Sequence, residues 1–137
     1  MKILIVDDDQ AIVVFLRLAV IKKGYEFVDT ASSGDEALEM VIRTHYDLIM
    51  LDITMPGPSG LEILSPLRSF CPHATLAVIS AHLPEEDSPD VVGCVDVMIS
   101  KPISLETINS LLDEAARICE QGRRLANWGV CLSQCGK

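Results

Sequence analysis

The amino-acid sequence predicts an α/β domain built on a single, doubly wound parallel sheet of five strands. Short apolar segments alternate along the chain with segments of helical periodicity. The apolar segments are mostly continuous, which is typical of parallel strands that helices cover on both faces. The length of 137 residues matches one domain with one sizeable core. Five strand–helix units in succession therefore give the fold class.

The five expected strands are apolar segments too brief to form helices. Aromatic residues make up only 4% of the chain, so the core has to consist mainly of aliphatic residues and methionine. The second segment gives the weakest strand signal. The expected strands lie at residues 3–6, 26–31, 48–51, 76–79 and 97–99.

Helices are expected between these strands. Ile12, Phe15, Leu16 and Ala19 have the spacing of one helical face, and Gly24 is expected to end that helix. The first helix therefore follows the first strand directly.

Capping residues and helix breakers mark the other helices. Ser33 followed by Glu36 has the spacing of a capping box. A third helix is expected over residues 60–68, before Pro72. The last helix has the clearest pattern, with Ser104 as its N-cap. Its apolar face consists of Leu105, Ile108, Leu112, Ala115 and Cys119.

The segment 83–96 carries the weakest helical pattern. Pro84, Pro89 and Gly93 interrupt it, and three consecutive acids begin at Glu85. Acidic residues favour a helix N-terminus, so a short helix is one alternative. Because proline breaks helices, we expect this segment to be irregular or mobile.

Composition bounds the functions that this chain can have. Eleven Lys and Arg residues against 20 Asp and Glu give a net charge of −9, which argues against direct binding of nucleic acid or an anionic membrane. No apolar run approaches the roughly 18 residues that span a bilayer, and no signal peptide is expected. Five cysteines without a CxxC pair fit a reduced, cytoplasmic protein. The apolar period fades after residue 120, so we assign residues 1–122 to the domain and 123–137 to a tail or the start of a linker.

Polar side chains with complementary chemistry stand at the carboxyl ends of four expected strands. Ligands bind at this edge in doubly wound sheets. Clustered carboxylates repel one another unless a hard cation such as Mg²⁺ intervenes, and a carboxylate can also attack phosphorus. An ammonium and a hydroxyl can then bind the phosphoryl oxygens. These residues are Asp7, Asp8, Asp9, Asp52, Ser80 and Lys101.

Four motifs at these positions resemble those of the receiver domains of two-component response regulators, such as the chemotaxis receiver. They are ILIVDDD at 3–9, LIMLDITMP at 48–56, VISA at 78–81 and KP at 101–102. The resemblance covers about residues 1–122. It implies a flavodoxin-like (βα)5 fold with strand order 2-1-3-4-5.

The resemblance also implies a metal site. Asp8 matches the acid that binds Mg²⁺ directly, and Asp7 matches the acid that acts through a water molecule. Asp52 contributes a further carboxylate, and Thr54 matches the residue whose backbone carbonyl completes the site.

The implied function is a phosphorylation-dependent signalling switch. Asp52 is the expected phosphoacceptor, with a sensor histidine kinase or phosphotransfer protein as donor. Ser80 matches the switch hydroxyl, and Lys101 matches the lysine that pairs with the phosphate. The resulting change of conformation would regulate a downstream partner or effector, and the chain itself would not be an enzyme beyond self-phosphotransfer and autodephosphorylation. Thr54 and His82, two residues after the acceptor and the switch, would tune the lifetime of the acyl phosphate, with an ordinary surface-loop position as the alternative for His82.

One position departs from the family pattern. Met98 stands three residues before Lys101, where the family usually has a switch aromatic. Met98 is either an ordinary core residue or part of an altered switch, since a flexible thioether cannot report the flip of a ring.

Two other function classes remain open at this stage. Asp7-x-Asp9 also begins the motif of Mg²⁺-dependent phosphatases of the haloacid-dehalogenase type, although Ala11 stands where that motif usually ends in Thr or Val. The second alternative is a scaffold with a receiver fold that does not respond to phosphate. The chain could be a stand-alone switch or a fragment of a larger regulator or hybrid kinase.

Overall fold

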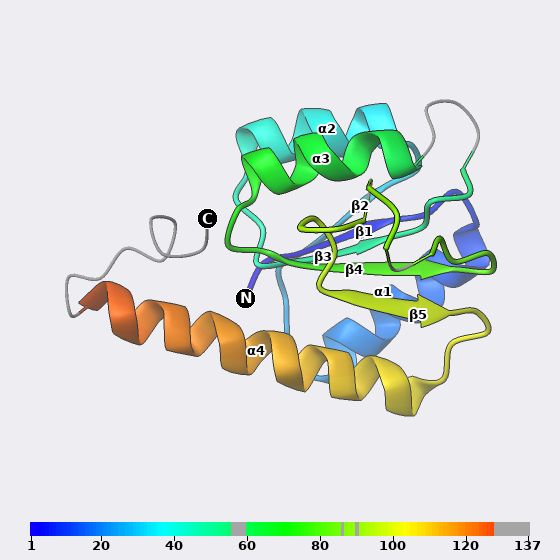
Figure 1. The fold of residues 1–137 in the computed structure, drawn as a ribbon. Helices are drawn as coiled ribbons and strands as arrows, with labels where there is room; N and C mark the ends of the chain where they lie inside the picture. Colours follow the sequence, from blue (N-terminus) through cyan, green and yellow to red (C-terminus); the bar gives the residue numbers. More distant parts are fainter. Residues whose placement is uncertain (56–59, 86, 90, 128–137) are drawn as a thin grey trace.

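A five-stranded parallel sheet forms the centre of the molecule (Figure 1). The computed structural model describes residues 1–137 except 56–59, 86, 90 and 128–137. The strands follow the order β2-β1-β3-β4-β5, and every neighbouring pair is parallel. The predicted sheet and strand order are therefore confirmed. The strands are β1 (Ile3–Val6), β2 (Val28–Ala31), β3 (Leu48–Leu51), β4 (Thr75–Ser80) and β5 (Val97–Ser100).

Four helices cover the two faces of this sheet in the described part of the chain. Helices α1 (Gln10–Lys22) and α4 (Leu105–Asn127) lie on one face, and α2 (Gly34–Arg43) and α3 (Gly60–Phe70) lie on the other (Figure 1). Strand residues alternate between two apolar clusters because successive side chains point to opposite faces. Thus Leu4 packs with the α2 and α3 residues, whereas Ile5 packs with those of α1 and α4.

The helix caps follow the sequence signals. Asp9 caps α1, and Gly24, with φ of +99°, ends it in a Schellman motif closed by two backbone hydrogen bonds. The Ser33 hydroxyl accepts from the Glu36 N–H at 3.2 Å, and the Ser104 hydroxyl accepts from the Thr107 N–H at 3.1 Å. These N-caps are confirmed.

The capping box at α2 differs in one detail from the predicted form. The Glu36 carboxylate accepts from the N–H and the hydroxyl of Ser32, at 3.4 and 3.1 Å. The predicted box would have bonded it to the backbone of Ser33 instead.

The connection between β4 and β5 is irregular in its described residues, as expected for the segment with the weakest helical pattern. Its described residues form turns, and none of them is helical. Pro84 and Pro89 lack the N–H that a helix needs, and Gly93 has a positive φ of +78°. Helix α4 therefore follows β5, whereas the described residues after β4 form no helix.

A single arginine anchors the second half of this connection. From α3, the Arg68 guanidinium donates to the Cys94 carbonyl at 3.0 Å, to the Ala74 carbonyl at 2.8 Å and to the Asp96 carboxylate at 2.7 Å. The same Asp96 oxygen accepts from the Leu76 N–H at 2.8 Å. Hydrogen bonds of these two side chains thus hold the end of the connection against α3 and the start of β4.

The C-terminal helix extends further than the sequence predicts. Helix α4 continues to Asn127, so the expected domain boundary at residue 122 falls inside a helix. The boundary itself remains a prediction, and the expected tail beyond residue 127 lies outside the described residues. No described helix combines the length and the apolar character that crossing a membrane requires.

Candidate functional site

The candidate site lies at the carboxyl ends of four neighbouring strands. Asp7 follows β1, Asp52 follows β3, Ser80 ends β4 and Lys101 follows β5. Because these strands are adjacent in the sheet, the four side chains converge on one edge. Asp7, Asp52 and Ser80 are almost fully buried, with exposures of 2%, 4% and 0%. The structure therefore brings together four of the six polar residues that the sequence singled out, whereas Asp9 caps α1.

The ammonium group of Lys101 joins two of the buried carboxylates. Its Nζ atom lies 2.8 Å from Asp7 Oδ2 and 3.1 Å from Asp52 Oδ2. Burial alone would lower the pKa of Lys101, but its hydrogen bonds and charge interactions with the two carboxylates raise it. The site thus contains a permanent cation between Asp7 and Asp52.

Asp52 is surrounded by hydrogen-bond donors. Its Oδ1 atom accepts from the N–H of Thr54 at 2.9 Å and from the Thr54 hydroxyl at 2.8 Å. Burial alone would raise the pKa of Asp52, but the Thr54 donors and Lys101 outweigh it and hold the pKa below its usual range. Asp52 is therefore an ionised carboxylate with one oxygen facing Lys101.

Asp7 responds differently to a similar environment. Burial raises the pKa of Asp7, and the charge of Asp52 acts in the same direction. The Asp9 N–H, 2.9 Å from Asp7 Oδ1, and Lys101 reduce this effect without cancelling it. Asp7 is thus the carboxylate of the pair whose charge a further cation would stabilise.

Three carboxylates have the arrangement that a metal ion needs. Asp7, Asp8 and Asp52 each offer one oxygen, and these oxygens all lie within 4.8 Å of one another. Asp8 is exposed at the mouth of the site, whereas the other two are buried. Oxygen ligands of this kind suit Mg²⁺, which also keeps several waters. The charge of Lys101 offsets only one of the three carboxylates, so the donor set fits a divalent cation.

Thr54 contacts the site through groups other than the predicted one. Its N–H and hydroxyl bind Asp52, and the hydroxyl oxygen also lies 3.3 Å from Ser80 Oγ. The role of the Thr54 carbonyl as a metal ligand stays a prediction. Sequence reasoning missed the link from Asp52 to Ser80. The one available signal was a hydroxyl-bearing residue two positions after the acceptor.

Met98 and His82 lie outside this hydrogen-bonded centre. Met98 on β5 pairs with Val78 of β4 and packs, partly buried, against the apolar cluster on the α2 and α3 side. His82 is exposed in the loop after β4. Their predicted roles in switching and in acyl-phosphate lifetime stay predictions.

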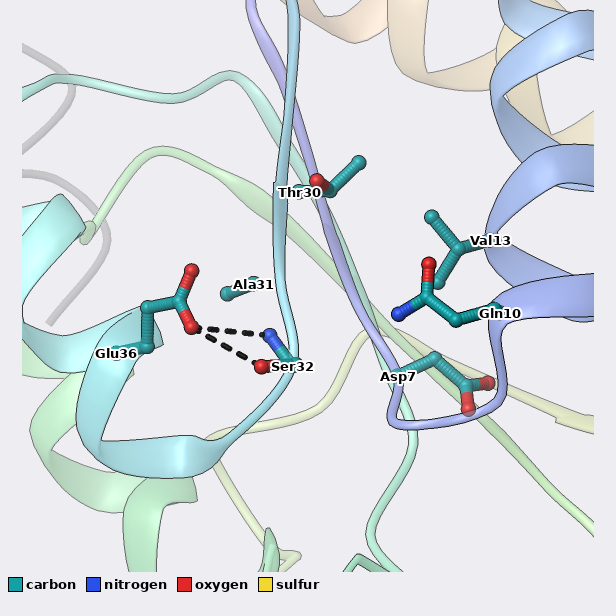
Figure 2. Close-up of a pocket in the computed structure, with 7 residues that line it drawn as sticks. All are labelled: Asp7, Gln10, Val13, Thr30, Ala31, Ser32 and Glu36. Carbon is teal, nitrogen blue, oxygen red and sulfur yellow. Dashed lines mark hydrogen bonds between the residues drawn. The ribbon is translucent and has the colours of Figure 1, made fainter.

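A pocket of about 180 Å³ lies beside Asp7, on the side of β1 away from Asp52 (Figure 2). Glu36 at its edge already binds Ser32, as the dashed lines of Figure 2 show. Asp7 is the one predicted site residue that lines this pocket. The other reactive groups, Lys101 and Asp52, lie outside it. Its lining residues are Asp7, Gln10, Val13, Thr30, Ala31, Ser32 and Glu36.

Known protein sequences similar to this chain are response regulators. Response regulator MprA of Mycobacterium leprae is 39% identical over 111 residues, which are 79% of this chain and 47% of MprA. The alkaline phosphatase synthesis transcriptional regulatory protein PhoP of Bacillus subtilis is 32% identical over 122 residues, which are 87% of this chain and 50% of PhoP. The chain thus spans about half the length of these relatives.

Solved structures with the same fold belong to the same group. A response regulator receiver domain protein (CheY-like) from Methanospirillum hungatei superposes with a TM-score of 0.79 at 26% identity, covering 90% of this chain and 97% of that one. Response regulator protein TrrA from Thermotoga maritima, in complex with Mg(2+)-BeF, gives 0.73 at 32% identity, covering 84% and 99%. The family model described as response regulator receiver domain matches residues 3–113. The chain therefore belongs to the receiver domains of two-component response regulators.

Proposed function

We propose that this chain is a signalling switch in which Asp52 accepts a phosphoryl group with the help of Mg²⁺. The observation that carries the proposal is the buried, ionised carboxylate of Asp52, 3.1 Å from the Lys101 ammonium. A carboxylate in this state is a nucleophile, and the cation beside it can stabilise the incoming negative charge.

The proposed donor is a phosphohistidine on a sensor histidine kinase or phosphotransfer protein. One oxygen of Asp52 forms a bond to phosphorus while the bond from phosphorus to the donor imidazole nitrogen breaks, and the imidazole leaves with that electron pair. Lys101, which binds Asp52 Oδ2 before transfer, then pairs with a phosphoryl oxygen. Ser80 donates its hydroxyl hydrogen to another phosphoryl oxygen.

The carboxylate cluster supports Mg²⁺ as the metal. Asp8 and Asp52 would bind the ion directly, Asp7 through a water molecule, and Thr54 through its carbonyl. When bound, the ion supplies positive charge to the carboxylates and the phosphoryl oxygens. The Mg(2+)-BeF complex of TrrA, which is 32% identical, supports this choice.

The output of the switch is regulation of another protein or domain. Phosphorylation adds negative charge and three acceptor oxygens, and Ser80 gains a hydrogen bond that exists only in that state. The chain acts as a switch rather than an enzyme, with self-phosphotransfer and autodephosphorylation as its only chemistry. Because its net charge is −9, we do not assign direct nucleic-acid binding to it. We place the exchange in the cytoplasm, where kinases obtain ATP.

The test is the intact mass of the chain after incubation with acetyl phosphate and Mg²⁺. Wild type should gain one phosphoryl group, and Asp52→Asn or wild type with excess EDTA should gain none. Phosphorylated Asp52→Asn together with inert Asp7→Asn would favour the phosphatase alternative. Wild type that takes up no phosphate would leave the receiver-fold scaffold as the function.

A further inference from the structure

The Thr54 hydroxyl connects the proposed phosphoacceptor to the proposed switch residue before any phosphoryl group is present. Its Oγ1 atom lies 2.8 Å from Asp52 Oδ1 and 3.3 Å from Ser80 Oγ. No buried side-chain nitrogen or oxygen among the described residues lacks a partner, and Ser80 Oγ, at 0% exposure, has Thr54 Oγ1 as its partner. Ser80 is shielded from water, so the hydroxyl of Thr54 takes the place of a solvent partner.

Counting hydrogens fixes the direction of both bonds. The Thr54 hydroxyl donates its single hydrogen to Asp52 Oδ1, because a carboxylate oxygen is an acceptor. In the contact between the two hydroxyls, Thr54 is therefore the acceptor and Ser80 is the donor. The one hydrogen that Ser80 can offer is already in use in the unphosphorylated state.

We propose that Thr54 is a positioning residue that holds the Ser80 hydroxyl hydrogen until a phosphoryl group replaces it as the acceptor. This inference rests on the proposed function of Asp52 and Ser80. Switching then exchanges one hydrogen bond for another, and no covalent step beyond the phosphoryl transfer is needed.

The two competing bonds differ in strength. The O···O distance of 3.3 Å between Thr54 and Ser80 is longer than the usual 2.7–2.8 Å for hydroxyl bonds, so the existing bond is weak. A bond from Ser80 to a charged phosphoryl oxygen is shorter and roughly twice as strong as a neutral one. Exchanging the bond to Thr54 for the bond to the phosphoryl group therefore favours the phosphorylated arrangement. The strength of the Thr54–Ser80 bond, which has to break first, determines how much of this gain in free energy remains.

The experiment measures binding of beryllofluoride, a phosphoryl mimic with fluorine acceptors, to the full chain by calorimetry at saturating Mg²⁺. Thr54→Val removes the hydroxyl at nearly constant shape, and Thr54→Ser keeps it. Each substitution is made with Ser80 present and in the Ser80→Ala background. Thr54 is exposed, so neither change creates a packing defect in the core.

With Ser80 present, Thr54→Val should leave the Ser80 hydroxyl unsatisfied in the free protein and so favour the bound state. The change in beryllofluoride affinity caused by Thr54→Val should differ between the two backgrounds. It should be about fivefold more favourable with Ser80 present than with Ser80→Ala, which corresponds to one net hydrogen bond. Thr54→Ser should match wild type in both backgrounds. Any effect through Asp52 alone cancels, because it is the same in both backgrounds.

Equal effects of Thr54→Val in the two backgrounds would overturn the inference, and so would a Thr54→Ser variant that behaves like Thr54→Val. The proposed function is judged separately by the parent proteins. If wild type binds beryllofluoride and Asp52→Asn does not, the acceptor assignment stands whatever Thr54 does. If wild type and Asp52→Asn behave alike, the acceptor assignment fails, and the Thr54 inference fails with it.

Discussion

Asp7 and Asp52 both bind the ammonium of Lys101. The negative charge of Asp7 nevertheless destabilises the folded chain, whereas that of Asp52 stabilises it. The pKa of Asp7 is raised by burial, so its charge is less favourable in the folded chain than in the unfolded one. Its contribution is fully present below the unfolded pKa and is lost as the pH rises through the folded pKa. The pKa of Asp52 is lowered, so its contribution is present above the unfolded pKa and is lost as the pH falls through the folded one.

Neutralising each residue should therefore shift the melting temperature in opposite directions at pH 7 without metal. Asp7→Asn should raise it by a few degrees, because the substitution removes an unfavourable buried charge. Asp52→Asn should lower it, because the amide cannot pair with Lys101 as the carboxylate does. Thermal unfolding followed by circular dichroism in EDTA measures both. Shifts of the same sign would contradict the assigned directions of the two pKa values.

Magnesium should stabilise the folded chain through the carboxylate cluster. A ligand at ten times its Kd that binds only the folded state adds about 1.4 kcal/mol, so the melting temperature should rise with Mg²⁺ concentration. Asp8→Asn should weaken this response, because Asp8 is one of the three clustered carboxylates. The matched control is Asp9→Asn, which removes the neighbouring charge but keeps an N-cap for α1. An equal loss of response in both variants would point to general charge attraction instead of a site.

At the scale of elements, the connection between β4 and β5 is the part whose structure depends most on one side chain. Arg68 is partly buried against backbone carbonyls, and its partner Asp96 also accepts from the N–H of Leu76. The proline positions explain why the described residues here form no helix. They do not reveal which residue stabilises the connection in place of a helix. That Arg68 reaches across 28 positions to Asp96 could not be read from the sequence, since no local pattern pairs them.

Removing the Arg68 side chain should destabilise the chain by about 1–3 kcal/mol, because Arg68→Met leaves several partly buried carbonyls without their donor and removes the ion pair with Asp96. Hydrogen exchange should accelerate at the amide of Leu76 and in residues 91–96. Arg117→Met is the control: Arg117 pairs with Glu114 on the surface of α4, with both side chains about 60% exposed, and should cost less than about 0.5 kcal/mol. Comparable losses in the two variants would show that Arg68 is not an anchor.

Residues 81–85, which follow the switch strand, receive none of these Arg68 bonds. We expect their amides to exchange faster than those of the helices, because residues 81–85 lie outside helices and strands and Pro84 interrupts them. Protection equal to that of α1 or α4 would contradict this expectation. Because Ser80 immediately precedes this segment, its mobility bears directly on how the switch is transmitted.

For the whole molecule, the sequence was informative wherever a residue's role depends on its neighbours along the chain. The apolar strands, the caps at Ser33 and Ser104, and the convergence of Asp7, Asp52 and Lys101 at one edge all follow from local pattern combined with parallel topology. The strand order came from resemblance, because periodicity does not specify which strands are neighbours. The bond from Thr54 to Ser80 was not predictable, since it depends on side-chain positions within a few tenths of an ångström.

The C-terminal limit of the folded unit is the last property to be tested at this scale. Among the side chains of α4 that the structure describes, residues 105–122, the buried ones are Ile108, Leu111, Leu112 and Ala115. A chain ending at residue 122 keeps all of them, so it should melt within about 2 °C of the full chain and take up phosphate from acetyl phosphate at the same rate. A chain ending at residue 110 loses two buried leucines. Each leucine is worth about 2–5 kcal/mol, and the total stability of such a domain is about 5–15 kcal/mol. The chain ending at residue 110 should therefore give the circular dichroism spectrum of an unfolded protein. If the chain ending at residue 122 were also unfolded, the domain boundary would lie beyond residue 122.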